Sequence, residues 1–287
     1  MNARRRPSPR GSAVLAALVA VGLALTSCTS PPTAHLSAPP VQAAPEPVDP
    51  AVEDLVAGAG MTTAAREVFL RARPEIQDSS TLATSCARSD GATGPGSTHT
   101  YGCVVRNRVF VRAFEQPEVR DLVYVVAAHE LLHLVYAGLT AAQRARLDAD
   151  LQVARDTIAA LEDRLAVYAE TDDDSLNEVH SILGTEFPDL PLALEAHYAA
   201  YFDRAAVLSA FRRTIGDRED ELRRLEASIA ATRERLTELG ARLDQLRTGS
   251  VAAYNAAVAT YNEVVAEHNG AIERYNLLLE EYRRLTA

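Results

Sequence analysis

The sequence has no lysine, so arginine carries all of its positive side-chain charge. Asp and Glu together number 39 against 29 for Lys and Arg, and the 287-residue chain has a formal net charge of −10. An acidic chain is a poor electrostatic match for nucleic-acid phosphates, so we expect no nucleic-acid partner. The hydrophobic fraction of 47% and the charged fraction of 24% are those of an ordinary folded protein, which excludes disorder over the whole chain.

The N-terminal apolar stretch is not long enough to predict a membrane span. This stretch, residues 11–25, follows four arginines and is too short for a transmembrane helix, but it fits a signal peptide. It ends in Leu-Thr-Ser-Cys at Cys28, which resembles the lipobox of bacterial lipoproteins. The resemblance implies a signal peptide over residues 1–27 and a lipid on Cys28. We therefore expect export and lipid anchoring at the outer face of the bacterial cell membrane, with a plain signal peptide as the alternative.

The segment after Cys28 is rich in proline, with seven prolines between Pro31 and Pro50. Proline-rich segments are extended and solvated, so residues 28–58 are predicted to form a tether that lifts a folded domain off the membrane.

Cysteine is scarce, with three in the whole chain. If Cys28 carries lipid, Cys86 and Cys103 remain as an even pair, which an oxidising compartment favours as a disulfide. A cysteine zinc site would need two more ligands at matching spacing, and the sequence has none nearby.

The pattern of apolar residues predicts a mainly α fold with a small β-hairpin or sheet. Residues 62–71 fit a short helix, residues 79–97 a loop, and residues 101–105 and 109–114 two strands around a tight turn at Arg106 and Asn107. Further helices are expected over 118–136, 141–169 in one or two pieces, 176–186 and 192–215.

The C-terminal residues 216–287 have the heptad spacing of a coiled coil. Apolar positions alternate in steps of three and four over 222–246 and again over 254–282, with turn chemistry between them. We expect an antiparallel coiled-coil hairpin; one continuous helix in a parallel dimer is the alternative. A polar stripe at every seventh residue beside the seam is either a solvated face or a contact for a protein partner: Asn255, Asn262, Asn269 and Asn276.

The motif with the clearest chemistry is His129-Glu130-Leu131-Leu132-His133. Residues four apart project from one face of a helix, so both imidazoles can bind one metal ion. Glu130 follows the first histidine and can take a proton from an activated water. The surrounding helix is strongly apolar, and a metal would offset the cost of burying these groups there. Two incidental core histidines are the alternative.

On these residues the chain resembles the zincin metallopeptidases. The glycine and third histidine of the metzincin branch are replaced by Tyr136 and Leu139. The gluzincin branch takes its third ligand from a Glu on a later helix, in an Asn-Glu-x-x-Ser setting that residues 177–181 match. The resemblance thus implies zinc held by His129, His133 and Glu178 in a zincin-like α+β domain over residues 59–215.

Glu178 also fits a role that needs no metal, because Ser175 and Glu178 have the spacing of a capping box. Glu186 is the main substitute as third ligand, and the remaining alternatives are His180, Asp172, Asp173 and Asp174. The thermolysin-like pattern places an Asp where this chain has Ile182, so the support of the ligand imidazoles differs from that pattern.

The resemblance implies a zinc-dependent peptidase of the cell envelope, with a peptide or protein substrate and Glu130 as general base. His197 and Tyr198 are candidates for stabilising the oxyanion of the intermediate, with packing as the alternative. The strand at 109–114 is a candidate for binding an extended substrate by strand addition, or is purely structural. A different class of function is a non-catalytic coiled-coil interaction lipoprotein whose zinc site is vestigial or structural.

Overall fold

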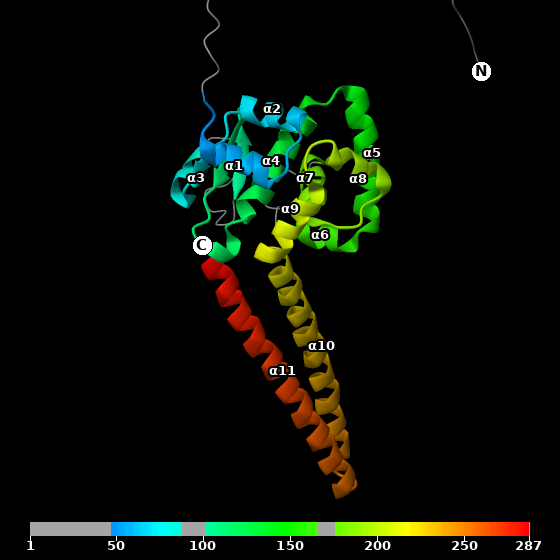
Figure 1. Cartoon of the computed structure of the whole chain (residues 1–287). Helices are drawn as coiled ribbons and strands as arrows, with labels where there is room; N and C mark the ends of the chain where they lie inside the picture. Colours follow the sequence, from blue (N-terminus) through cyan, green and yellow to red (C-terminus); the bar gives the residue numbers. More distant parts are fainter. Residues whose placement is uncertain (1–46, 88–100, 166–175, 287) are drawn as a thin grey trace, which may run out of the picture. The chain divides into compact units, whose positions relative to one another are not determined.

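The computed structural model describes residues 47–87, 101–165 and 176–286 (Figure 1). The predicted signal peptide, Cys28 and most of the tether lie outside these residues. The described part is mainly helical, with a three-stranded sheet and a long pair of C-terminal helices, which confirms the predicted fold class. Among the described helices, none is both long and apolar enough to cross a membrane.

Two short helices at the start of the folded part cover the core. Helix α1 (Pro50–Gly58) is capped by the side chain of Asp49, and α2 (Thr63–Arg71) by that of Thr62. The tether was expected to continue to residue 58, but the structure differs there, because α1 contributes three side chains to the main core: Val52, Leu55 and Val56.

The sheet has the strand order β1-β3-β2. Strands β2 (Gly102–Val105) and β3 (Arg108–Arg112) form the predicted antiparallel hairpin. Its tight turn is made by Arg106 and Asn107, which have φ values of 50° and 61°, as two-residue hairpin turns require.

Strand β1 (Glu75–Gln77) was not predicted, and it changes the function expected of the hairpin. It pairs in parallel with β3, so β3 lies in the centre of the sheet between two neighbours. The expectation that residues 109–114 bind a substrate by strand addition is therefore wrong, because the backbone groups of a central strand are already paired. The edge strand of the hairpin is β2.

Helix α3 (Ser79–Cys86) forms where a loop was expected. Serine and threonine are weak helix formers, so the pattern of residues gives little sign of this helix. Asp78 starts it, since one carboxylate oxygen accepts hydrogen bonds from the backbone N–H groups of Ser80 and Thr81 at 2.9 and 3.0 Å. The predicted disulfide is present, and Cys86 at the end of α3 is joined to Cys103 in β2.

Helix α4 (Leu122–Gly138) lies within the main core and contacts α1, α2, α7 and α9. It follows the short helix η1 (Pro117–Val119), so the predicted helix at 118–136 begins a few residues later than expected. The remaining helices of this part follow the predicted order, with breaks at Ile158 and at residues 200–203: α5 (Ala141–Thr157), α6 (Ala159–Leu165), α7 (Leu176–Glu186), α8 (Leu192–Ala199) and α9 (Arg204–Phe211).

The C-terminal hairpin consists of α10 (Asp217–Leu246) and α11 (Val251–Thr286), which lie side by side (Figure 1). The π-helical segment η2 (Arg212–Gly216) leads into α10. Arg218 Nε lies 3.0 Å from Glu281 Oε1, and Arg235 lies 3.1 Å from Glu267. The pairing of an early residue of α10 with a late residue of α11 confirms the antiparallel hairpin.

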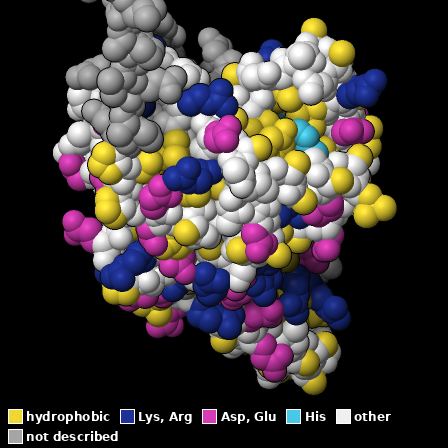
Figure 2. All heavy atoms as spheres, turned by 45° about the horizontal axis from the view of Figure 1, so that its top comes forward, with side chains coloured by type: hydrophobic (Ala, Val, Ile, Leu, Met, Phe, Trp, Pro, Cys, Tyr) yellow, Lys and Arg dark blue, Asp and Glu magenta, His cyan; other side chains and the backbone are white. Residues whose placement is uncertain are grey.

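Acidic, basic and hydrophobic side chains lie interspersed on the face of the molecule that Figure 2 shows. The four asparagines at every seventh residue of α11 are all exposed, so the stripe they form is in contact with solvent in this chain: Asn255, Asn262, Asn269 and Asn276.

Candidate metal centre

The candidate site depends on the close approach of helices α4 and α7. Gly184 of α7 faces α4, and a β-carbon on it would lie 2.5 Å from Leu132 Cδ1 and 2.8 Å from Tyr198 Cε1. A side chain at this position would displace Leu132 and Tyr198, so glycine allows α7 to pack against these side chains. The face of α7 that carries Glu178 consequently reaches the histidines of α4.

His129, Glu130 and His133 offer ligand atoms that all lie within 4.8 Å of one another. Glu178 lies across the two imidazoles, with Oε1 3.3 Å from His129 Nε2 and Oε2 3.5 Å from His133 Nε2. The Glu178 carboxylate is thus directed at both histidines, while Ser175, its predicted capping partner, lies outside the described residues. The helical pattern therefore brings together the four residues that the sequence singles out.

Ser181 orients His133, a contact that was not predicted from the sequence. Its Oγ donates to the backbone carbonyl of Asn177 at 3.2 Å and lies 3.3 Å from His133 Nδ1. While the hydroxyl hydrogen stays on the Asn177 carbonyl, Oγ can accept from a hydrogen on His133 Nδ1. In that tautomer His133 Nε2, which faces Glu178, carries the lone pair that a metal ligand requires. Ile182, at the position of the expected Asp, is buried in the core.

The carboxylates of the site are buried among apolar side chains, and this shifts their proton equilibria. Burial raises the pKa of Glu130 to about 8. Burial also opposes the charge on Glu178 and on His129, but their mutual attraction outweighs it, so the pKa of Glu178 is lowered and that of His129 is raised. Glu178 is therefore an ionised carboxylate, which suits it to a cation.

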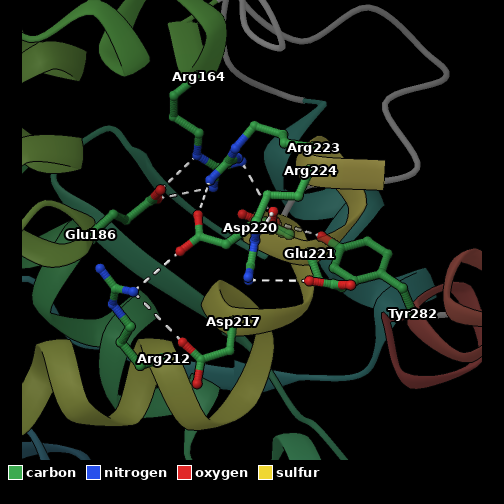
Figure 3. A network of polar contacts seen from close by, with 10 residues as sticks. Arg164, Glu186, Arg212, Asp217, Asp220, Glu221, Arg223, Arg224 and Tyr282 are labelled. Carbon is green, nitrogen blue, oxygen red and sulfur yellow. Dashed lines mark hydrogen bonds and ion pairs between the residues drawn. The ribbon is translucent and has the colours of Figure 1, made fainter. Parts of the chain in front are cut away.

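Glu186, the alternative third ligand, is engaged by a different partner. Arg164 of α6 holds its carboxylate with two hydrogen bonds, Nε to Oε2 at 2.6 Å and Nη2 to Oε1 at 2.9 Å (Figure 3). Arg164 also lies 3.8 Å from Glu219 at the start of α10, whose carboxylate accepts a hydrogen bond from Tyr282. The further alternatives Asp172, Asp173 and Asp174 lie outside the described residues.

His180, His197 and Tyr198 form a separate cluster. Nε2 of His180 lies 2.8 Å from Nε2 of His197, and the Tyr198 hydroxyl donates to the His180 carbonyl at 2.9 Å. Burial lowers the pKa of both histidines, so both rings are neutral. Tyr198 is fully buried, and this packing excludes it as a donor to a substrate oxyanion. His197 lines a surface pocket with Asp150 and Tyr201.

The donor set fits a metal ion. Glu130 Oε2 is buried without a hydrogen-bond partner among the described residues, whereas Glu178 Oε1 lies 3.3 Å from His129 Nε2. Buried carboxylate oxygens without donors are costly unless a cation or water meets them. Two imidazole nitrogens with a carboxylate 3.3 and 3.5 Å away are a set of groups that divalent transition metals such as zinc bind. The sequence motif and the geometry therefore agree that this group could hold a metal ion.

Comparisons of the chain with protein-family models, with curated proteins and with solved structures find no match. The function must therefore be inferred from the site itself.

Proposed function

We propose that the protein is a zinc-dependent peptidase in which His129, His133 and Glu178 hold the metal. The observation that carries the proposal is the place of Glu178, whose two oxygens face the Nε2 atoms of both histidines. Glu130 is a buried carboxylate beside these ligands, and its Oε2 has no hydrogen-bond partner among the described residues. A purely structural metal site does not need such a group.

Each residue of the site has a different role in the proposed hydrolysis of a peptide bond. When bound, zinc supplies Lewis acidity, which makes water a better nucleophile and polarises a peptide carbonyl. Glu130 is the general base: Oε2 accepts the proton of the attacking water and then passes it to the leaving amine. A nearby cation lowers the pKa of a carboxyl group, which returns Glu130 to its ionised form. Ser181 Oγ, 3.3 Å from His133 Nδ1, would accept from Nδ1–H and so favour the tautomer that leaves Nε2 unprotonated.

We also propose that the peptidase acts in the cell envelope, on a peptide or protein substrate. The signal peptide expected over residues 1–27 would direct export, and the lipid expected on Cys28 would anchor the protein to the outer face of the membrane. The coiled-coil hairpin would then offer a contact for a protein partner away from the buried metal-facing residues.

The test compares wild-type chain with Glu130→Gln, each purified in detergent as the full chain and loaded with zinc. The substrate is a peptide library prepared from bacterial cell-envelope proteins, and mass spectrometry identifies new peptide ends. Glu130→Gln should keep one zinc per chain and cleave at least about 100-fold more slowly, since it cannot accept the proton. Glu263→Gln, an exposed position of α11, is the matched control and should behave as wild type.

Two outcomes would contradict the peptidase. One is zinc-loaded wild-type chain that cleaves no peptide in the library. The other is cleavage by Glu130→Gln at the wild-type rate. Either outcome, together with bound zinc, would favour the interaction lipoprotein with a structural metal site.

A further inference from the structure

Gly102, the first residue of edge strand β2, lies directly against the carboxylate of Glu130. A β-carbon on Gly102 would lie 2.7 Å from Glu130 Oε1 and 3.0 Å from Glu130 Cγ. Gly102 does not have a positive φ. Its backbone conformation is therefore open to other residues, and what favours glycine at this position is the lack of space for a side chain.

The strand has little freedom to move away from α4. Gly102 is paired with Val111 of the central strand β3, and Val111 is completely buried. The next residue, Cys103, is joined by the disulfide to Cys86 of α3. A side chain at position 102 would therefore displace atoms of α4, of which the nearest is Val126 Cγ1 at 2.6 Å, followed by Glu130 Oε1 at 2.7 Å.

We infer that Gly102 is a positioning residue for the general base. Because it has no side chain, the edge strand can lie against Glu130 Oε1 and hold the carboxylate beside the metal-facing nitrogens. The three atoms nearest to an added β-carbon belong to Val126 and Glu130 and none to a metal ligand, so we expect a substitution to displace the base more than the ligands. The inference rests on the proposed function, which assigns the proton transfer to Glu130.

The kinetic test uses Gly102→Ala as the full chain in detergent, with the same library of cell-envelope peptides. We expect zinc content and KM to stay near wild type, and kcat to fall on the order of 100-fold, as for a reacting group displaced by about 1 Å. The control is Gly138→Ala at the end of α4, where an added β-carbon meets nothing within 4 Å. Loss of zinc from Gly102→Ala, or an unchanged kcat, would overturn the inference.

A second variant tests whether the effect of Gly102→Ala comes from the contact with Glu130 or from that with Val126. In Gly102→Ala/Val126→Ala the methyl groups of Val126 are gone, and the Glu130 carboxylate remains the obstacle. The rate should stay low although part of the thermal stability returns. Recovery of the wild-type rate would assign the effect to Val126 and overturn the inference.

Thermal unfolding tests the same contact without any peptidase activity. Gly102→Ala should lower the unfolding midpoint in the wild-type background, and by at least about 2 °C less in the Glu130→Ala background, where the overlapping carboxylate is absent. An equal drop in both backgrounds would overturn the inference. If wild-type chain cleaves no peptide, the proposed function fails, and this double-mutant cycle still decides whether Gly102 and Glu130 are in contact.

Discussion

The metal centre and the coiled-coil hairpin both contain buried or half-buried polar side chains, but these side chains are satisfied to different degrees. In the hairpin, Thr232 Oγ1 lies 2.8 Å from His268 Nδ1, and the Tyr282 hydroxyl donates to Glu219 at 2.7 Å. In the metal centre, Glu130 Oε2 is buried without a hydrogen-bond partner among the described residues, and the Glu178 oxygens lie 3.3 and 3.5 Å from the two histidine rings.

This difference distinguishes the polar groups of the hairpin, which specify its structure, from those of the metal centre, which are arranged to bind a ligand. A polar pair in a helical seam fixes the register and is complete within the chain. A buried carboxylate oxygen without a hydrogen-bond donor destabilises the folded chain until a cation binds to it. We therefore expect changes at the metal centre to have larger effects than changes in the hairpin, and the following experiments test that order.

Removal of the metal should have the largest effect. At a zinc concentration about 1,000 times Kd, binding to the folded chain alone adds about 4 kcal/mol to the free energy of unfolding. Thermal unfolding of the full chain with excess zinc and with a chelator measures this difference. Equal midpoints under the two conditions would show that no zinc is bound by the folded state.

Glu178→Gln should come next, because it removes a ligand whose oxygens face both histidines. We expect zinc affinity to fall by more than about 100-fold, since loss of an orienting neighbour alone costs about 10–100-fold. Glu186→Gln is the matched control, as Arg164 and not the histidines holds that carboxylate. Competition with a coloured zinc chelator gives both affinities. A larger loss in Glu186→Gln would make Glu186 the third ligand.

Ser181→Ala should have an intermediate effect. The variant removes Oγ, which lies 3.3 Å from His133 Nδ1, so the tautomer with Nε2 unprotonated loses the support of this contact. We expect zinc affinity to fall about 10–100-fold. Ser181→Thr keeps the hydroxyl and should recover most of the affinity, whereas equal losses in both variants would argue against the hydrogen bond.

The ligand motif could be predicted because it is local in sequence. His129, Glu130 and His133 lie within one helical turn, so spacing alone places them together. Glu178 was found through its Asn-Glu-x-x-Ser setting, and the structure places it against both histidines. Ser181 belongs to the same setting and lies three residues after Glu178, so helical spacing could have indicated its contact with the site.

Features that depend on tertiary contacts could not be predicted. The three-residue strand β1 is defined by its pairing with β3. This pairing places β3, which was expected at an edge, in the centre of the sheet. The helix at Ser79–Cys86 depends on its cap and its disulfide more than on helix propensity. Nothing in the local sequence indicates the inferred role of Gly102, because that role depends on its contact with Glu130 of helix α4.

In the hairpin, Tyr282→Phe should destabilise the chain moderately. Glu219 has only 12% of its side chain exposed, and burial raises its pKa, so loss of the Tyr282 donor leaves a poorly solvated carboxyl group. We expect a loss of about 1–3 kcal/mol in chemical denaturation. Tyr275→Phe removes the equivalent bond to Glu226 at an exposed position and should cost less than about 0.5 kcal/mol. Similar losses in the two variants would contradict this reasoning.

Gly240→Ala should have the smallest effect, and its sign should be opposite. Gly240 lies inside α10, and a β-carbon there meets nothing within 4 Å. Alanine restricts the unfolded chain more than glycine does, so we expect a gain of about 0.5–1 kcal/mol in the free energy of unfolding. Ala241→Gly, at the exposed neighbouring position, should lose a similar amount. A loss in Gly240→Ala would mean that this side of the hairpin is covered in solution, because an open helix surface has room for the methyl group.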